Sequence, residues 1–376
     1  MFALASRSAF PSSASASIGT KGPCAMRIAV DAMGGDHAPD AIVRGCADAL
    51  PDLPAGDQLV LVGRRHDIEE LLTERGVSPS DPRIEIVHCD EVIDMHESPV
   101  DSVRAKKNSS IVVSAQMGSF RAGDKRCDVV LSAGNTGACV SAATMQMKRL
   151  RGVHRPGIAV TFPAFHGPVV LCDAGANPEP RPSHLWQYGL MSEVFSRTVL
   201  GIESPRVAQM NIGSEEGKGG SLINQVHELF KATPNINYVG FIEGRDLFDG
   251  VADVVVTDGF VGNTLLKMAE GMARSLFKAI AHEIFEHSPD LGLQLEPIFK
   301  GIYKKNDYHE YGGAPLLGVN GVYVIAHGSS EAKTIKNAIR NSRQYVTCGV
   351  NEAIVARLAE VSSIAVQEVG SEQEQA

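Results

Sequence analysis

The sequence predicts an α/β protein built on a Rossmann-like sheet of mostly parallel strands, with helices on both faces. Short β-branched runs alternate with longer amphipathic segments from Met26 onward, which is the pattern of repeated strand and helix units. Several of the short runs are apolar on both faces, as strands inside a parallel sheet are. The chain has 376 residues, 44% of them hydrophobic, which is enough to bury the core of one large domain or of two joined lobes.

The expected strands and helices follow from these runs in chain order. Strands are expected at residues 27–31, 58–63, 83–88, 128–132, 168–173, 205–211, 237–241 and 252–257, where β-branched residues are concentrated. Among the helices expected between and after them are residues 39–50, 135–147, 182–200, 219–231 and 261–285. No internal repeat is visible, and one domain is expected over residues 26–362.

The two ends of the chain have a different composition from this domain. Residues 1–25 contain no acidic residue and are rich in Ser and Ala, so they are expected to be a disordered leader or an extension upstream of a start at Met26. Residues 363–376 are expected to form a polar tail.

Composition excludes several classes of protein. The longest apolar runs, near residues 111–116 and 251–257, are far shorter than the roughly 20 residues of a membrane-spanning helix. The 7 cysteines are scattered without a CxxC pair, which fits reduced thiols and neither a disulfide framework nor a zinc site. A formal charge of −9 argues against broad nucleic-acid binding, since that requires a concentrated basic face.

Glycine-rich loops follow several of the expected strands. The segments are MGGD, AGNTG, AGAN, IGSEEGKGG and DGFVGN. Ligands of open parallel sheets bind at the carboxyl ends of strands, where the next helix offers free N–H groups and the positive end of its dipole. These loops together therefore predict one anion site. The dinucleotide fingerprint GxGxxG does not follow the first strand and no GxxxxGK[ST] loop occurs, which disfavours a nicotinamide dehydrogenase and a P-loop ATPase.

A set of longer segments closely resembles the bacterial phosphate acyltransferases known as the PlsX family. They are RIAVDAMGGDHAP, SAGNTGA, DAGAN, NIGSEEGKG, EGRDLFDGVADVVVTDGFVGN, YGGAPLLGVNG and AHGSS, and they span about residues 26–358 in the family's order. The resemblance implies a homodimer with a fold akin to phosphate acetyltransferases and isocitrate-type dehydrogenases. It also implies transfer of a fatty acyl group from acyl carrier protein to inorganic phosphate for phospholipid synthesis, no metal or organic cofactor, and peripheral attachment to the inner face of the cytoplasmic membrane.

Two residues are the candidates for catalysis. Lys218 precedes an expected helix, where its ammonium adds to the dipole, and it matches a lysine that the resemblance places in the active site; Gly217 stands where the family commonly has a further lysine. Asn263 closes TDGFVGN and can donate N–H groups to an oxyanion without adding charge. The alternatives are a solvated loop lysine and an asparagine that caps a helix.

The substrate and phosphate-binding candidates are the polar and glycine residues of the same loops. They are Asp31, Gly34, Gly35, Asp36, Ser132, Gly134, Asn135, Thr136, Gly137, Asp173, Gly175, Asn177, Asn211, Gly213, Asp258, Gly259, Gly313, His327, Gly328 and Ser329. Asp31 is equally expected to hold loop N–H groups, and a lone histidine such as His327 is more often structural than catalytic. GxSxG is absent and no cysteine has a recognisable His partner in the sequence, so direct attack by phosphate is preferred over an acyl-enzyme.

Docking of acidic acyl carrier protein predicts a basic surface. One candidate is Arg104, Lys106 and Lys107, and the other is Lys148, Arg149, Arg151 and Arg155; solvated helix faces would give the same pattern. Residues 286–310 are expected to protrude as a helical hairpin, in which Leu291, Leu293, Leu295, Ile298 and Phe299 alternate with Lys300, Lys304 and Lys305. By resemblance this segment contacts an anionic membrane, although a dimer interface or a hairpin packed on itself would look the same.

Two other functions remain open from the sequence. A short-chain phosphate acetyl- or butyryltransferase that uses coenzyme A would share the fold and the phosphate step, and only the length of the acyl pocket would distinguish it. A lipid-binding or acyl-carrier-binding protein without catalysis is the third possibility, and the presence of both Lys218 and Asn263 counts against it.

Overall fold

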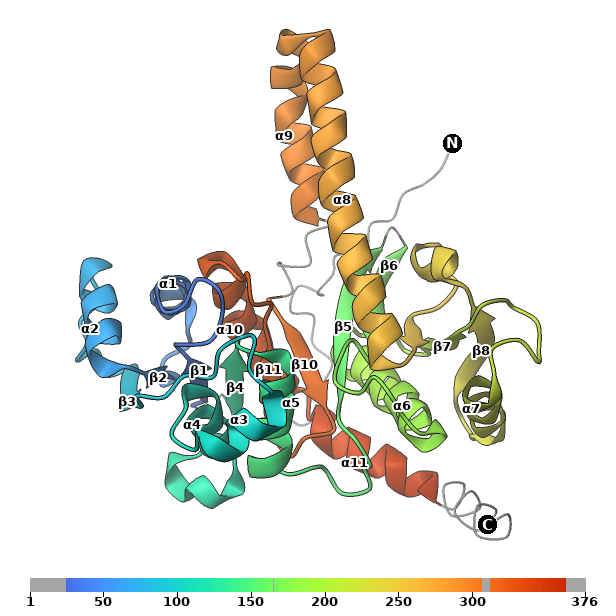
Figure 1. Cartoon of the computed structure of the whole chain (residues 1–376), viewed down its shortest axis with the longest axis horizontal. Helices are drawn as coiled ribbons and strands as arrows, with labels where there is room; N and C mark the ends of the chain where they lie inside the picture. The colour runs from blue at the N-terminus through green and yellow to red at the C-terminus, as the bar shows by residue number, and fades with distance from the viewer. Residues whose placement is uncertain (1–24, 165, 306–311, 363–376) are drawn as a thin grey trace.

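The computed structural model describes residues 25–164, 166–305 and 312–362, which contain an 11-stranded mixed sheet (Figure 1). In chain order the strands are β1 (Arg27–Asp31), β2 (Gln58–Gly63), β3 (Ile84–His88), β4 (Val129–Ser132), β5 (Gly157–Ala164), β6 (Gly167–Cys172), β7 (Arg206–Met210), β8 (Asn237–Ile242), β9 (Val254–Val256), β10 (Ala314–Leu317) and β11 (Val322–Ile325). Across the sheet their order is β3-β2-β1-β4-β11-β10-β5-β6-β9-β7-β8.

The sheet consists of two parallel blocks that run in opposite directions. Pairing is parallel from β3 to β11 and again from β6 to β8, and it is antiparallel between β11 and β10, β10 and β5, and β5 and β6. The predicted mostly parallel sheet is therefore confirmed, and each strand expected from the sequence is present within two residues at either end. The strands that the sequence pattern missed, β5, β10 and β11, are the ones that join the two blocks.

Helices cover both faces of the sheet, as predicted. They are α1 (Asp40–Ala49), α2 (Arg65–Glu74), α3 (Pro99–Ala105), α4 (Ser110–Met117), α5 (Thr136–Gln146), α6 (Pro182–Thr198), α7 (Ser221–Ala232), α8 (Gly259–His287), α9 (Pro289–Lys305), α10 (Ala332–Thr347) and α11 (Val350–Glu360). Apolar side chains of α1, α2, α6, α7, α10 and α11 form one core on one face, and those of α3, α4, α5 and the first turns of α8 form a second core on the other. The sheet is thus buried on both sides, which explains why its strands are apolar on both faces.

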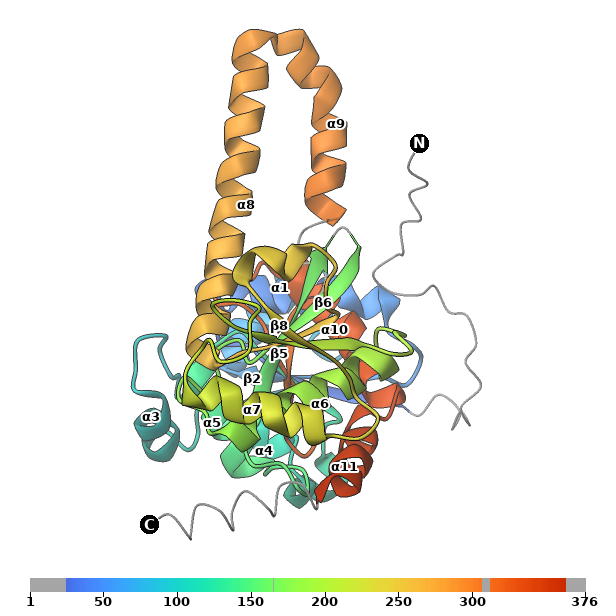
Figure 2. The same ribbon diagram turned by 90° about the vertical axis from the view of Figure 1, so that its right-hand side faces the viewer.

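The longest helix, α8, begins at the sheet and projects well beyond it, and α9 returns beside it (Figures 1 and 2). Gly292 allows the two helices to approach at the tip, because a Cβ there would lie 2.6 Å from the Phe285 ring. The protruding hairpin therefore begins earlier in the chain than residue 286, since the outer turns of α8 form its first arm. In the part of the chain that is described, no helix has both the length and the hydropathy needed to cross a bilayer. The predicted leader, apart from Ala25, and the predicted tail lie outside the described residues.

Candidate active site

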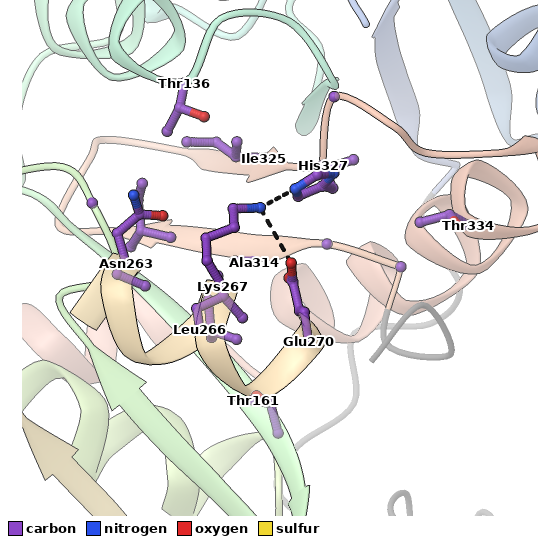
Figure 3. A pocket seen from close by; sticks show the side chains of 18 of the residues that line it. Thr136, Thr161, Asn263, Leu266, Lys267, Glu270, Ala314, Ile325, His327 and Thr334 are labelled. Atoms are coloured by element: carbon purple, nitrogen blue, oxygen red, sulfur yellow. Dashed lines mark hydrogen bonds and ion pairs between the residues drawn. The ribbon is translucent and has the colours of Figure 1, made fainter. Parts of the chain in front are cut away.

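A cavity of about 350 Å³ lies where α8 passes over the strands that join the two blocks (Figure 3). This volume is at the lower end of the roughly 300–1,000 Å³ of small-molecule sites. Its apolar wall comes mainly from β5, α8, β10 and β11, and its ionisable side chains come from α8 and from the loops after β1 and β11. Its lining includes Asp36, Met95, Thr136, Ile158, Val160, Gly175, Asn263, Leu266, Lys267, Glu270, Gly313, Ile325, His327 and Gly328.

The first turns of α8 are held against the loop after β6. Asp258 caps the helix, since its Oδ1 accepts a hydrogen bond from the Val261 N–H at 2.9 Å. Only glycine fits at position 262, because a Cβ there would lie 1.9 Å from the Asp173 carbonyl oxygen. This close approach brings Asn263 next to Gly175, whose own Cβ position would lie 3.6 Å from the Asn263 Cβ. Asn263 therefore reaches the cavity from the start of α8.

One face of α8 presents a line of polar side chains to the cavity. Asn263, Lys267 and Glu270 are spaced i, i+4 and i+7, which places them on the same side of the helix (Figure 3). Lys267 Nζ contacts His327 Nε2 and lies 3.3 Å from Glu270 Oε2. The sequence prediction missed Lys267 and Glu270, although their spacing from Asn263 in GNTLLKMAE was a signal that could have identified them.

The loop after β11 supplies His327. Its Nδ1 lies 2.7 Å from Ser329 Oγ and accepts a hydrogen bond from the Ser329 N–H at 3.1 Å, so the loop orients the ring with Nε2 toward Lys267. The Asp36 N–H donates to the Gly328 carbonyl at 2.8 Å, which ties the loop after β1 to the loop after β11. Gly35 has φ +116°, a conformation that favours glycine, and it packs against the Gly328 carbonyl.

The structure brings part of the predicted site together at this cavity. The predicted residues on its lining are Asp36, Thr136, Gly175, Asn263, Gly313, His327 and Gly328. Gly34, Gly35, Gly134, Gly137, Gly213, Gly259 and Ser329 belong to the predicted loops and are not on the lining. The predicted loops after β1, β4, β6 and β9 therefore contribute to one cavity even though the two parallel blocks run in opposite directions.

Asp31 and Ser132 join the ends of β1 and β4 below the cavity. Asp31 is fully buried and accepts hydrogen bonds from Ser132 Oγ at 2.6 Å and from the Met33 N–H at 3.2 Å. Ser132 Oγ in turn accepts from the Gly134 N–H at 3.1 Å. Burial raises the pKa of the Asp31 carboxyl above its ordinary value. Asp31 therefore holds N–H groups of its own loop. This is the role that its place at the end of a strand suggested as the alternative to substrate contact.

Asn135 and Asp173 organise the loops after β4 and β6. Asn135 caps α5 by accepting from the Ala138 N–H at 3.1 Å, and its amide donates to backbone carbonyls of the segment before α3, the nearest being Met95 O at 3.0 Å. Asp173 is fully buried and accepts from the N–H groups of Ile158, Ala176 and Asn177. Burial raises the pKa of Asp173 to about 6, against the opposing effect of these hydrogen bonds.

Lys218 is not on the lining of the cavity. Its Nζ lies 2.7 Å from Glu215 Oε2, the side chain is 49% exposed, and its carbonyl accepts a hydrogen bond from Asn211 Nδ2 at 3.2 Å. The physical reason is the strand order, since the Lys218 loop follows β7, and β9 lies between β7 and β6. A role for Lys218 in the chemistry therefore stays a prediction.

The sequence is similar to one protein family and to phosphate acyltransferases from several bacteria. Residues 26–353 match the family described as "Fatty acid synthesis protein". A phosphate acyltransferase of Dictyoglomus turgidum is 43% identical over 340 residues, which cover 90% of this chain and 99% of the relative. A phosphate acyltransferase of Desulforamulus reducens is 46% identical over 330 residues, covering 88% and 96%.

Solved structures support the fold. A phosphotransacetylase from Streptococcus pyogenes superimposes with a TM-score of 0.58 at 15% identity, covering 88% of this chain and 94% of that one. The EutD phosphotransacetylase from Staphylococcus aureus gives 0.52 at 14% identity, with the same coverage. The predicted similarity to phosphate acetyltransferases is confirmed at the level of fold. Together with the close sequence relatives, this shows that the chain belongs to the fatty acid synthesis protein family, among its phosphate acyltransferases.

Proposed function

We propose that this phosphate acyltransferase transfers a long-chain fatty acyl group from acyl carrier protein to inorganic phosphate, and so supplies acyl phosphate for phospholipid synthesis. The observation that supports this most strongly is the composition of the cavity. Ile158, Val160, Leu266 and Ile325 offer an apolar wall for an acyl chain, and Asn263, Lys267 and His327 offer hydrogen-bond donors beside it.

The reaction needs positioning more than it needs a base. A phosphate oxygen forms a bond to the thioester carbonyl carbon, the C–S bond breaks, and the proton of monohydrogen phosphate ends on the released thiol of the carrier. Atoms and charges balance without any further reactant. The protein must hold the anion close to the carbonyl carbon and stabilise the oxyanion of the tetrahedral intermediate.

Asn263 is the proposed oxyanion donor. Its side chain is exposed in the cavity at the second turn of α8, near the positive end of the helix dipole. An amide stabilises a developing negative charge without competing for the anionic nucleophile, which a second lysine at this position would do.

Lys218 is proposed as a second cation that acts when substrate is bound. For this role its ammonium must leave Glu215, and glycines at 217, 219 and 220, each with positive φ, make the loop able to change conformation. The proposal predicts that Lys218→Ala lowers turnover, whereas a solvated loop lysine would tolerate the change.

Direct attack by phosphate is proposed over a cysteine acyl-enzyme. Among the described residues Cys46, Cys89, Cys127, Cys139 and Cys172 are buried. Burial raises the pKa of Cys139, which lies close to the β4 loop, to about 12, and it raises the pKa of Cys127 to about 11. Thiols with such pKa values supply almost no thiolate at neutral pH. A stoichiometric acyl-protein trapped from acyl carrier protein without phosphate would contradict this.

The proposed docking surface for acyl carrier protein is the cluster of Lys148, Arg149, Arg151 and Arg155, whose side chains are all exposed. In the other candidate, Lys106 is held by Glu97 at 2.5 Å and by the Val92 carbonyl, so less of its charge is available to a partner. Charge reversal of Lys148 and Arg149 is expected to raise the KM for acyl carrier protein and to leave the KM for phosphate unchanged.

The protruding hairpin is proposed to bind reversibly to the inner face of the cytoplasmic membrane. Leu291, Leu293, Ile298 and Ile302 are exposed on α9, and Leu293 is 61% exposed. The side chains of Lys300, Lys304 and Lys305 lie outside the described ones. Flotation with anionic liposomes is expected to recover the wild type and not the double variant Leu293→Asp and Ile298→Asp; equal flotation would contradict membrane contact.

A homodimer is proposed through the inner part of α8. Met268, Met272, Leu276 and Ile280 repeat every fourth residue, all are exposed, and they form an apolar stripe along the helix. In the proposed dimer a second copy of the chain covers this stripe. Sedimentation equilibrium is expected to give a dimer for the wild type and a monomer for Met272→Glu combined with Leu276→Glu.

The experiment that tests the function mixes purified protein with palmitoyl-acyl carrier protein and phosphate and traps acyl phosphate as its hydroxamate. Phosphate-dependent product that is lost in Asn263→Ala and Lys218→Ala would support the proposal. Product from acetyl coenzyme A and not from the long-chain substrate would favour a short-chain enzyme, and no product from either would favour a binding protein.

A further inference from the structure

Two hydrogen-bond donors face each other in the cavity at Lys267 and His327 (Figure 3). The Ser329 N–H can only donate, and it points at His327 Nδ1 at 3.1 Å. The proton of the neutral imidazole therefore resides on Nε2, which faces the Lys267 ammonium. A cationic ammonium and a ring nitrogen therefore lie side by side on the lining of the cavity. Such a pair favours an anionic ligand with accessible oxygens.

Next to these donors is an acceptor with spare capacity. The Glu270 side chain is only 8% exposed, and its Oε2 lies 3.3 Å from Lys267 Nζ. Its other oxygen, Oε1, is buried and accepts no hydrogen bond within the described part of the chain. A buried carboxylate oxygen without a donor is unfavourable, so a ligand that brings an O–H group would be stabilised here. Rotation of the carboxylate lets one oxygen keep Lys267 while the other accepts.

We infer that Lys267, His327 and Glu270 form a subsite that recognises monohydrogen phosphate by its P–OH group and discriminates against sulfate. Lys267 Nζ and His327 Nε2 donate to phosphate oxygens, and Glu270 accepts from the P–OH. This inference rests on the proposed function, in that the anion bound here is the phosphate that attacks the thioester. Two of its residues, Lys267 and Glu270, were not included in the sequence prediction.

The chemistry of the two anions gives the subsite its selectivity. Near neutral pH phosphate and arsenate carry an O–H group, and sulfate is a dianion without one. Sulfate at this position would place an oxygen against the Glu270 carboxylate with no proton between them. Asp36, also on the lining, adds a second negative charge that disfavours any anion without a compensating donor. A cavity in which Glu270 only holds Lys267 would bind phosphate and sulfate alike.

The test measures anion preference with and without turnover. In the hydroxamate assay, arsenate should compete with phosphate at similar concentrations and sulfate should compete weakly. Glu270→Gln replaces the acceptor with a group that can also donate, so the ratio of the sulfate inhibition constant to the phosphate KM should fall by about tenfold or more. Lys267→Met should raise the KM for phosphate by about tenfold or more and leave that ratio near the wild-type value.

Matched controls come from residues of α8 that are not on the lining of the cavity. Glu283 and Lys278 are exposed on the same helix and away from the cavity, so Glu283→Gln and Lys278→Met should leave both constants unchanged. If Glu270→Gln does not fold, the same ratio measured in Glu270→Asp and the preference of the wild type for phosphate over sulfate still test the inference. Equal competition by sulfate and phosphate in the wild type would overturn the inference, as would an unchanged ratio in Glu270→Gln or an unchanged phosphate KM in Lys267→Met.

Calorimetric titration of the same proteins with phosphate and with sulfate separates this inference from the proposed function. Phosphate binding that depends on Glu270 and Lys267, without acyl phosphate formation, would refute the function and support the subsite. Acyl phosphate formation with binding that is indifferent to both substitutions would support the function and refute the subsite.

Discussion

Replacement of Gly262 by alanine should damage both the stability and the activity of the protein. A Cβ at position 262 would lie 1.9 Å from the Asp173 carbonyl oxygen, and real contacts of this kind are essentially never closer than 3.0 Å, so one backbone must move by about 1 Å. The β6 loop resists this shift, because the Asp173 N–H donates to the Thr257 carbonyl and its carboxylate holds neighbouring N–H groups. Overpacking costs about 1–3 kcal/mol. Because backbone atoms lie on both sides of this contact, a loss of about 3 kcal/mol or more in the free energy of unfolding is expected.

The same shift should reach the chemistry, because Asn263 is the next residue. A displacement of about 1 Å at a positioned group costs on the order of 100-fold in rate. Urea denaturation measures the first effect and hydroxamate trapping of acyl phosphate measures the second.

Gly271 on the same helix is the matched control for this prediction. It has nothing within 4 Å of its Cβ position, so Gly271→Ala should stabilise the protein by about 0.5–1 kcal/mol through helix propensity alone. If Gly262→Ala matched the wild type in stability and in kcat/KM, the proposed tight contact between α8 and the β6 loop would be refuted.

Three further predictions concern other parts of the molecule. Asn263→Ala should lower kcat by about 100- to 1,000-fold with little change in the KM for phosphate, as expected for loss of an oxyanion donor; an unchanged kcat in the hydroxamate assay would exclude that role. In the folded state the pKa of Asp173 is raised to about 6 from an ordinary value of 3.8. Between these two pH values folding is therefore accompanied by the uptake of a proton, and the stability that this group contributes is lost as the pH rises through about 6. Relative to Asp173→Asn, the wild type should therefore gain up to about 3 kcal/mol in unfolding free energy as pH falls across that window, and parallel pH profiles in urea denaturation would contradict this. In the wild type the buried Trp186 indole N–H donates to Thr233 Oγ1 at 2.8 Å, so Thr233→Val removes its acceptor and should lower the free energy of unfolding by about 1–3 kcal/mol. Denaturation followed by tryptophan fluorescence measures this, and an unchanged midpoint would show that the bond contributes nothing.

The regular part of the fold was predictable because it depends on local patterns. Apart from β11, the strands of both parallel blocks are short apolar runs flanked by glycine or polar residues, and their bounds in the structure differ from the predicted ones by at most two residues. The strands β10 and β11 were not predicted. Each has four residues and lies in a glycine-rich segment, so neither run is long enough to show a period.

The polar loop residues were predictable as a group and not as individuals. Asp31, Asn135 and Asp173 follow strands in the same way as Asp36 and Thr136 do, yet the first three hold backbone N–H groups in the interior. Sequence position does not show which way a side chain points from a loop. Whether a polar group meets a backbone donor or the cavity depends on how neighbouring strands are ordered.

The sequence by itself determined the family, the alternation of strands and helices, and the presence of polar groups after the strands, because each of these features depends only on short stretches of residues. Tertiary structure decided which groups share a cavity. The central strands bring α8 to the loop after β11, so that Lys267, which is paired with Glu270, meets His327. The order of the outer strands leaves Lys218 beside Glu215 and off the lining of that cavity. Both outcomes depend on the order of the strands in the sheet, which pairs segments far apart in the chain and is not specified by any local pattern.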